Sequence, residues 1–256
     1  MKLIVFIIIF IIATTVTLNS TNLYLPKCNN NKLLTTPITF FISSDVLEIQ
    51  TKLAITDNID SWIVYANQTL SNSCIPIKRE VSEILYIKEL TEELFQDIHV
   101  AHVFLEYYVG YEKISRLKEN KAHYYGIIFK SYQSSFNAQW CGKTDVDTLP
   151  DFFILAADCT VDILEHELGH LAWAKHDKEN YSPSYMSNYA LNRIFPYAFG
   201  FECAGKGTIM SYEKEVLPIY SSPNIFYYGE RCGDSRYANN ARVLRDFALK
   251  TLISEK

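Results

Sequence analysis

EHELGHLAWAKHD, residues 165–177, holds three of the chain's six histidines within eleven positions. His166, Glu167 and His170 form the pattern H-E-x-x-H. Residues i and i+4 of a helix lie one above the other, so both imidazoles project from one face and can bind one metal ion. Glu167, beside the first of these ligands, is then next to the open coordination position, where a general base acts. The stretch therefore predicts a helix that carries a metal site.

The third histidine of the stretch, His176, follows His166 by ten positions. At this spacing, a chain that leaves the helix can return a third nitrogen to the same ion. The apolar residues of the helix would pack it against a sheet; they are Leu164, Leu168, Leu171 and Ala172. The residues alone leave one alternative open, a surface helix with unrelated histidines.

The N-terminus has the features of a secretory signal. Lys2 precedes an apolar run from Leu3 to Ala13, and a polar stretch follows. The run is too short to span a bilayer comfortably, since a membrane helix needs about 20 apolar residues. We therefore assign residues 1–20 to a signal peptide, 21–34 to a short N-terminal arm and 35–256 to one domain. We expect a secreted protein, extracellular or periplasmic; an uncleaved N-terminal anchor is the alternative.

Six cysteines lie beyond the proposed signal, and an even number in an exported chain indicates disulfides. Six cysteines allow fifteen connectivities, among which sequence alone does not choose. Our prediction is the pairing of nearest neighbours: Cys28–Cys74, Cys141–Cys159 and Cys203–Cys232.

The composition is globular and acidic, with a formal net charge of −5 and a pI of about 5.7. Nucleic acid is therefore not an expected partner, because phosphate binding requires concentrated positive charge. Beyond the N-terminal run, no apolar segment is long enough for a membrane, so we expect no stable membrane association.

Predicted strands and helices alternate along the domain. β-Branched, aromatic and apolar runs predict five strands, of which Phe136–Gly142 is a candidate edge strand. These are Ile38–Asp45, Cys74–Lys88, Phe136–Gly142 and Asp151–Cys159, with a further buried strand at Tyr124–Tyr132. Helical spacing predicts helices over Leu47–Leu70, within His102–Lys121, and at the C-terminus after a cap at Asn239 or Asn240. This order indicates an α/β (α+β) fold with a mixed, twisted sheet.

Beyond its histidines, the sequence resembles the metzincin zinc endopeptidases. In that family, H-E-x-x-H-x-x-G-x-x-H is followed by a Met-turn. Here GTIMSY, residues 207–212, is similar to such a turn, with Met210 34 positions beyond His176. Asp177 and the two cysteines ahead of the helix look most like the reprolysin-like (adamalysin-like) branch and its bacterial relatives, the peptidyl-aspartate metalloendopeptidases. The segment SSPNIFYYGERCG, followed by ANNARVL, is also similar to the C-terminal part of those bacterial enzymes.

The resemblance implies a zincin-like metzincin catalytic domain over residues 35–256, with an active-site helix and a C-terminal helix. It implies Zn²⁺ bound by His166, His170 and His176, with Glu167 as general base for a zinc-bound water. The expected function is that of a secreted, monomeric zinc endopeptidase that acts on a protein or peptide substrate.

Three further residues acquire roles from the resemblance. Met210 would form the apolar floor beneath the metal. Tyr212 would bind or swing over the zinc and donate a hydrogen bond to the developing oxyanion. Asp177 would accept hydrogen bonds behind the ligands.

One residue departs from the family pattern, because Trp173 stands where the family has glycine. That glycine ends the helix in a left-handed conformation, which costs other residues about 1–2 kcal/mol. Either the turn is built differently here or the site is weakened. We expect the first, since the cost is small beside the about 10–16 kcal/mol with which zinc peptides hold their metal.

Three alternatives stay open. The chain could be a secreted binding protein on a metzincin scaffold that has lost catalysis, with Trp173 as the reason. A carboxylate such as Glu202 could replace His176 as third ligand. Cys28, in LPKC, could act as a cysteine switch on the zinc, although an even number of cysteines favours a disulfide.

Other features carry weaker predictions. His99 and His102 lack an acidic neighbour that would complete a metal site, and we expect them to be loop histidines. Glu165 points away from Glu167 on a helix, and we expect it to be solvated. A substrate peptide is expected to add as a strand along the edge near Phe136–Cys141.

Overall fold

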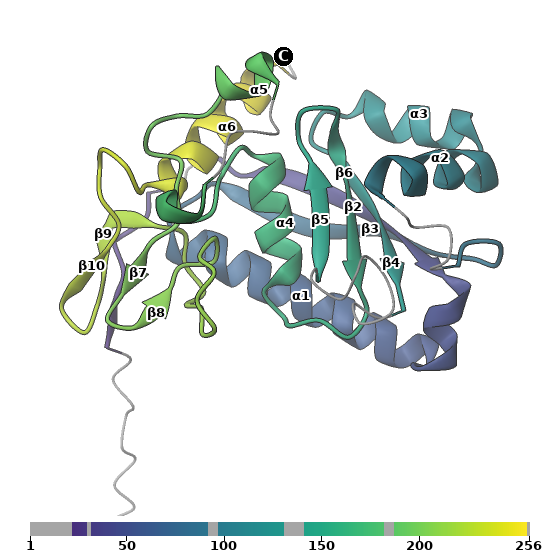
Figure 1. The fold of residues 1–256 in the computed structure, drawn as a ribbon, viewed down its shortest axis with the longest axis horizontal. Coiled ribbons are helices and arrows are strands. Elements are labelled where there is room, and N and C mark those ends of the chain that lie inside the picture. Colours follow the sequence, from purple (N-terminus) through teal and green to yellow (C-terminus); the bar gives the residue numbers. More distant parts are fainter. Residues whose placement is uncertain (1–21, 30–31, 92–96, 131–140, 182–186, 255–256) are drawn as a thin grey trace, which may run out of the picture.

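A five-stranded sheet forms the centre of the protein (Figure 1). The structure, a computed structural model, describes residues 22–29, 32–91, 97–130, 141–181 and 187–254. The strand order is β3-β2-β4-β6-β5, and β5 alone runs antiparallel to its neighbour. The strands are β2 (Leu34–Ser43), β3 (Ile77–Ile87), β4 (Tyr124–Phe129), β5 (Gly142–Asp145) and β6 (Leu149–Ala156). The predicted mixed sheet is confirmed, and β5 lies at its edge.

Helices cover both faces of this sheet. On one face, α1 (Lys52–Asn72) and α4 (Ile163–Leu171) pack against Phe153 and Leu155 of β6. On the other face, α2 (Ile98–Val109) and α3 (Tyr111–Glu119) pack against Ile154 of the same strand. Alternate residues of β6 thus enter opposite cores, as the period of a strand requires.

The C-terminal third contains short elements beside α4. The strands β7 (Glu202–Cys203) and β8 (Lys206–Gly207) form a hairpin, and β1-β9-β10 form a small sheet. The members of that sheet are β1 (Leu23–Tyr24), β9 (Ser222–Tyr227) and β10 (Glu230–Cys232). The remaining elements are η1 (Ser44–Glu48), η4 (Lys178–Asn180), α5 (Asn188–Leu191) and α6 (Asn240–Ser254). The N-terminal arm therefore contributes a strand that pairs with β9.

All three predicted disulfides are present: Cys28–Cys74, Cys141–Cys159 and Cys203–Cys232. Three disulfides in a chain of this size indicate folding in an oxidising compartment. Because the sulfur of Cys28 is bonded to Cys74, the cysteine-switch hypothesis is wrong.

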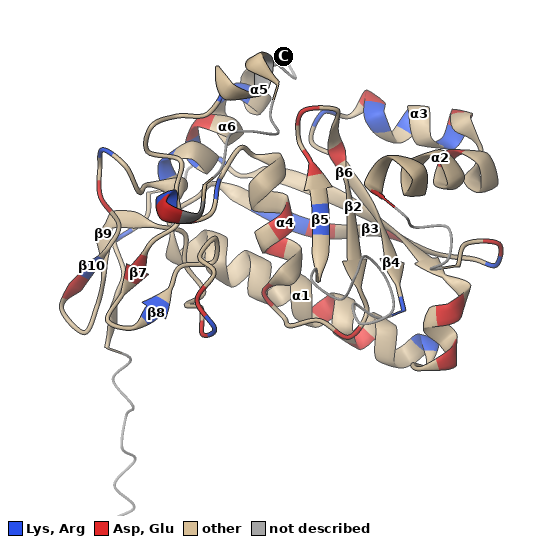
Figure 2. Ribbon diagram, in the orientation of Figure 1, with Lys and Arg blue, Asp and Glu red and all other residues tan. Residues whose placement is uncertain are grey.

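The structure also shows how the charged residues are distributed and how long the apolar helices are. Figure 2 shows acidic and basic residues interspersed over the elements rather than gathered on one of them. Within the described residues, no helix is both long enough and apolar enough to cross a membrane. The proposed signal peptide, residues 1–20, lies outside the described residues.

Of two predicted segments, one differs from the structure and the other lies largely outside the described residues. The helix expected within His102–Lys121 begins at Ile98. The Asp97 carboxylate caps it by accepting hydrogen bonds from two backbone N–H groups at 2.8 Å. Gly110, with φ +97°, divides the expected helix into α2 and α3. His99 and His102 consequently lie on α2, and the prediction of loop histidines is wrong because the cap was overlooked. Of the predicted edge strand Phe136–Gly142, only the last two residues are described, and β5 begins at Gly142.

Candidate metal centre

The helix α4 carries the H-E-x-x-H pattern, as predicted. Its buried side chains Leu164, Leu168 and Leu171 pack into the core between the sheet and α1. This packing directs the opposite face of the helix, which carries His166 and His170, toward a cleft. The spacing of three and four between the leucines thus fixes which way the histidines point.

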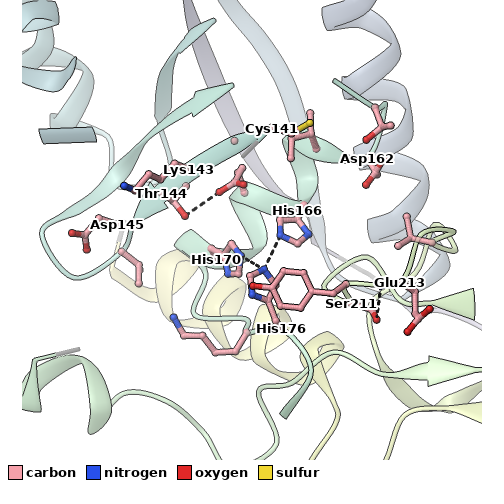
Figure 3. Close-up of a pocket in the computed structure, with 18 of the residues that line it drawn as sticks. Cys141, Lys143, Thr144, Asp145, Asp162, His166, His170, His176, Ser211 and Glu213 are labelled. Atoms are coloured by element: carbon pink, nitrogen blue, oxygen red, sulfur yellow. Dashed lines mark hydrogen bonds between the residues drawn. The ribbon is translucent and has the colours of Figure 1, made fainter. Parts of the chain in front are cut away.

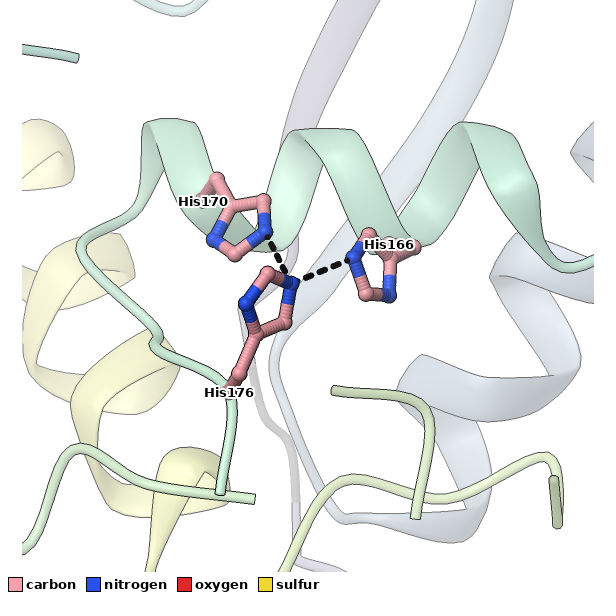
Figure 4. Close-up of side chains that lie close together, drawn as sticks. All are labelled: His166, His170 and His176. Carbon is pink, nitrogen blue, oxygen red and sulfur yellow. Dashed lines mark hydrogen bonds between the residues drawn. The ribbon is translucent and has the colours of Figure 1, made fainter. Parts of the chain in front are cut away.

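The side chains of His166, His170 and His176 converge on one point (Figure 4). The Nε2 atom of His176 lies 3.0 Å from Nε2 of His166 and 2.9 Å from Nε2 of His170. These three nitrogens form a group that could hold a metal ion. His176 reaches it from the chain after α4, which turns back toward the helix.

Hydrogen bonds on the far side of two rings determine which nitrogen is free. Nδ1 of His166 donates to the Ile209 carbonyl at 2.7 Å, and Nδ1 of His170 donates to the Ala174 carbonyl at 3.0 Å. A neutral imidazole carries one hydrogen, so both Nε2 atoms present lone pairs. A single hydrogen on His176 could satisfy only one of them, whereas a cation at the centre satisfies all three nitrogens.

Electrostatics keep the rings neutral. Burial lowers the pKa of His166, and burial together with the neighbouring imidazoles lowers the pKa of His170 well below its ordinary value. Burial also lowers the pKa of His176 to about 3. Neutral imidazole is the form that binds metals, so the donor set suits a transition metal such as zinc.

The turn after α4 is built with Trp173 in the left-handed conformation, φ +73°. The N–H of Ala174 donates to the Gly169 carbonyl at 3.0 Å, which closes the helix end. Our expectation of a differently built turn is therefore wrong, because tryptophan adopts the backbone conformation that the family glycine provides. The indole ring packs against two core clusters, with Nζ of Lys175 at 5.6 Å and the guanidinium of Arg193 at 5.5 Å. These contacts offset a strain of about 1–2 kcal/mol.

Glu167 lies against β5 and is 5% exposed. Thr144 donates a hydrogen bond to Oε2 of Glu167 at 3.2 Å. A Cβ atom on Gly142 would stand 2.7 Å from Cγ and 2.8 Å from Oε1 of the same side chain, so only glycine fits there. Burial raises the pKa of Glu167 to about 8, and the hydrogen bond from Thr144 opposes this shift.

Met210 is fully buried beneath α4 in the segment predicted as a Met-turn. Its Sδ atom would lie 2.7 Å from a Cβ on Gly169, so the missing side chain of that glycine lets the methionine approach the helix. Ser211 closes the turn, its N–H donating to the Thr208 carbonyl at 2.8 Å. The sulfur therefore packs directly against the helix that carries two of the histidines.

Asp177 joins this turn to the third histidine. Its Oδ2 atom accepts hydrogen bonds from the Ser211 hydroxyl at 2.8 Å and from the Tyr212 N–H at 3.2 Å. The ring of Tyr212 lies 4.1 Å from the ring of His176, centroid to centroid, and its side chain is half exposed. Asp177, which follows His176, thus fixes the position of Tyr212.

A cleft of about 800 Å³ contains the three histidines and Glu167 (Figure 3). One wall is β5 and the loop after it, with Lys143 and Asp145, and the other includes Tyr212 and Glu213. Two neighbours of the site, Thr144 and the carbonyl of Ile209, were not predicted from the sequence. A period-of-two reading of β5 could have suggested Thr144, but no sequence signal locates a carbonyl.

Two acidic residues lie elsewhere than predicted. Glu165 is fully buried and paired with Arg79, so the prediction that it is solvated is wrong. Glu202, the alternative third ligand, is an exposed residue of β7 and does not line the cleft. Among the described residues, the group that could hold a metal contains His176 and not Glu202.

Comparisons with known proteins give a fold and no family. No protein-family model matches the sequence, and no curated protein matches it. A chain from a structure described as a chaperone–substrate complex matches 87% of this chain with a TM-score of 0.65 and 17% identity. Metalloproteinase-II from Bacteroides fragilis matches 77% of this chain with a TM-score of 0.40 and 12% identity, a likeness too small to argue from. The present chain spans 35% of the first chain and 53% of the second, and the first likeness shows the fold alone.

Proposed function

We propose that this protein is a secreted, zinc-dependent endopeptidase with His166, His170 and His176 as metal ligands. The observation that supports it most strongly is the convergence of three Nε2 atoms in a cleft that also holds a buried carboxylate, Glu167. Three imidazole ligands with one open position are typical of catalytic zinc sites. The proposal also uses the resemblance of residues 165–177 and 207–212 to metzincin motifs.

The residues present fit zinc. In a tetrahedral site with Zn–N distances of 2.0–2.1 Å, ligand nitrogens lie about 3.3 Å apart. The distances of 2.9 and 3.0 Å from His176 to the other two nitrogens are close to this value. When bound, the metal would supply Lewis acidity toward a water molecule and the scissile carbonyl.

Glu167 is the general base and acid of the proposed mechanism. This buried carboxyl ionises more readily beside a cation bound by the three histidines, and the carboxylate then takes one proton from the attacking water as the water oxygen bonds to the scissile carbonyl carbon. The same carboxyl then returns the proton to the amide nitrogen, the C–N bond breaks, and an acid and an amine result. Thr144 holds the carboxylate in place, and Gly142 leaves the space that it occupies.

The substrate peptide adds in an extended conformation along β5. This strand is at the sheet edge and forms a wall of the cleft, so a peptide paired with it passes Glu167. Tyr212, on the other side, donates its phenolic hydrogen to the carbonyl oxygen as negative charge develops there. Asp177 and the ring of His176 keep the tyrosine at this place.

Zinc content and chelator-sensitive cleavage of an unfolded protein substrate test the proposal. Glu167→Ala should retain one equivalent of zinc and lose peptide cleavage. A Glu167→Ala variant as fast as wild type would contradict the role of this residue. Wild-type protein that contains zinc and cleaves nothing would instead favour the non-catalytic binding protein.

A further inference from the structure

A charged cluster lies behind α4, on the side away from the cleft. Arg79 of β3, Glu165 of α4 and Tyr220 are each at most 1% exposed. Nε and Nη2 of Arg79 donate to the two carboxylate oxygens of Glu165 at 3.0 and 3.1 Å. The hydroxyl of Tyr220 lies 2.7 Å from Oε1 of Glu165 and 3.0 Å from its backbone carbonyl.

Burial of this ion pair is costly, because both charges lose their hydration. Replacing a buried ion pair by apolar residues of similar volume often stabilises a protein. A contribution to stability therefore does not explain why this ion pair is present. The bidentate geometry instead determines an orientation, because a planar guanidinium accepts a carboxylate in a fixed plane. It therefore restricts rotation of α4 about its axis at Glu165, the residue before His166.

A chain of hydrogen bonds leads from Glu165 back to the ring of His166. Tyr220, bonded to Glu165, directly follows Ile219, and the carbonyl of Ile219 accepts from the N–H of Ile209 at 2.9 Å. The carbonyl of Ile209 in turn accepts from Nδ1 of His166 at 2.7 Å. The cluster is thus connected both to the backbone beside the first histidine and to the carbonyl that bonds its ring.

Packing places the same tyrosine beneath the second histidine. A Cβ atom on Gly169, the residue before His170, would lie 2.9 Å from the hydroxyl of Tyr220 and 2.7 Å from Sδ of Met210. Tyr220 and Met210 therefore approach α4 at one point, between its two histidines. A shift of Tyr220 would move the floor of the site as well as the Ile209 carbonyl.

We propose that Glu165, held by Arg79, and Tyr220 are positioning residues for the metal centre, and that they set the orientation of the His166 imidazole through the Ile209 carbonyl. The proposal rests on the proposed function only in requiring that the three histidines bind a metal. None of the three residues touches the metal or the substrate.

Tyr220→Phe tests this with little change in volume. We expect its affinity for zinc, measured by competition with a chromophoric chelator, to fall by about tenfold, the lower end of the range for loss of a group bonded directly to a ligand, because Tyr220 acts through the Ile209 carbonyl. The visible absorption bands of the cobalt-substituted protein should shift, because the ligand field changes. Glu165→Gln should act in the same direction.

A matched control removes the hydroxyl of a second buried tyrosine near Arg79, one that forms no hydrogen bond with Glu165. Tyr124 is buried with its ring 5.4 Å from Arg79, and its hydroxyl has no hydrogen-bond partner among the described residues. Tyr124→Phe should leave zinc affinity and the cobalt spectrum unchanged. A double variant, Arg79→Met with Glu165→Leu, should fold with its midpoint in urea unchanged or raised, yet bind zinc more weakly.

Wild-type protein is measured first, so the two proposals fail in different ways. A wild type that binds no zinc would overturn the proposed function. A wild type that binds zinc, with Tyr220→Phe and the double variant equal to it in affinity and cobalt spectrum, would overturn the positioning role alone.

Discussion

The surroundings of Glu167 are set by two residues of β5 that point to the same side. Thr144 donates to Oε2 of Glu167 at 3.2 Å. This hydrogen bond favours the ionised form of Glu167, so its loss should raise the pKa of Glu167 and lower kcat, by roughly tenfold for each pKa unit, while KM and zinc content stay the same. Thr144→Val should show this effect, and Thr144→Ser should restore the rate. A serine variant as slow as the valine variant would show that the methyl group, not the hydroxyl, is important.

Gly142 supplies space rather than a bond. A methyl group there would lie 2.7 Å from Cγ of Glu167, closer than real side-chain atoms approach. Gly142→Ala should therefore displace the carboxylate and reduce kcat more than Thr144→Val does, with zinc still bound. Steady-state kinetics and metal analysis of both variants check this order, and equal rates for Gly142→Ala and wild type would contradict it.

Single residues also show where sequence reasoning was insufficient. The three histidines and Met210 follow a linear pattern, and the structure brings the three imidazoles together and buries the methionine. The environments of Trp173 and Glu165 depend on partners far along the chain, namely Arg193 in the one case and Arg79 in the other. A motif specifies which residues share a helix face, but not what is packed behind them.

At the scale of elements, the Cys141–Cys159 disulfide joins the start of β5 to the loop before α4. Cys141 lines the cleft and precedes Gly142. Closing a loop of this length contributes about 3 kcal/mol. Replacing both cysteines by serine should lower the free energy of unfolding by about this amount, and should also reduce kcat, since the strand that holds Glu167 is released.

The Cys203–Cys232 disulfide provides the matched comparison. Its loop is longer, its sulfurs belong to a separate buried cluster, and neither cysteine lines the cleft. Its removal should cost a similar free energy of unfolding but leave kcat unchanged at temperatures well below the melting point. If both double variants lose activity in proportion to stability alone, β5 does not depend on its disulfide.

Elements with a strong local signal were predicted well. Strand alternation and helical spacing located β2, β4, β6 and α1 to within a few residues, and Asn239 caps α6 by accepting from the Arg242 N–H at 3.1 Å. The break between α2 and α3 at Gly110 was missed because apolar spacing continues across it. Strand β1 was missed because two residues carry no period, and only its pairing with β9 defines it.

At the scale of the whole molecule, two cores lie on opposite faces of the sheet, and the core between the sheet and α2 lies against a buried histidine. His102 of α2 is 6% exposed, and Nε2 lies 2.8 Å from the hydroxyl of Tyr125 on β4. Lys118 and His99 disfavour its protonation, whereas Glu106 favours it. Burial, the largest influence, lowers the pKa of His102 to about 4.

This shift makes stability depend on pH far from the proposed metal centre. In the unfolded chain His102 takes up a proton near pH 6.5, but in the folded protein only near pH 4. Between these values the unfolded state binds more protons, so the free energy of unfolding is fully present above about pH 6.5 and falls as the pH drops toward 4. We expect His102→Gln to remove about 1–3 kcal/mol of that fall, as measured by urea unfolding at several pH values.

Val103→Gln is the matched control, because Val103 lies on the same helix with an exposed side chain that carries no titratable group. Its curve of unfolding free energy against pH should run parallel to that of wild type. The three histidines of the cleft are present in all three proteins, so their own protonation cancels in the comparison. Parallel curves for His102→Gln and wild type would mean that protonation of His102 does not cause the loss of stability in acid, and that the core behind α2 tolerates a charged His102.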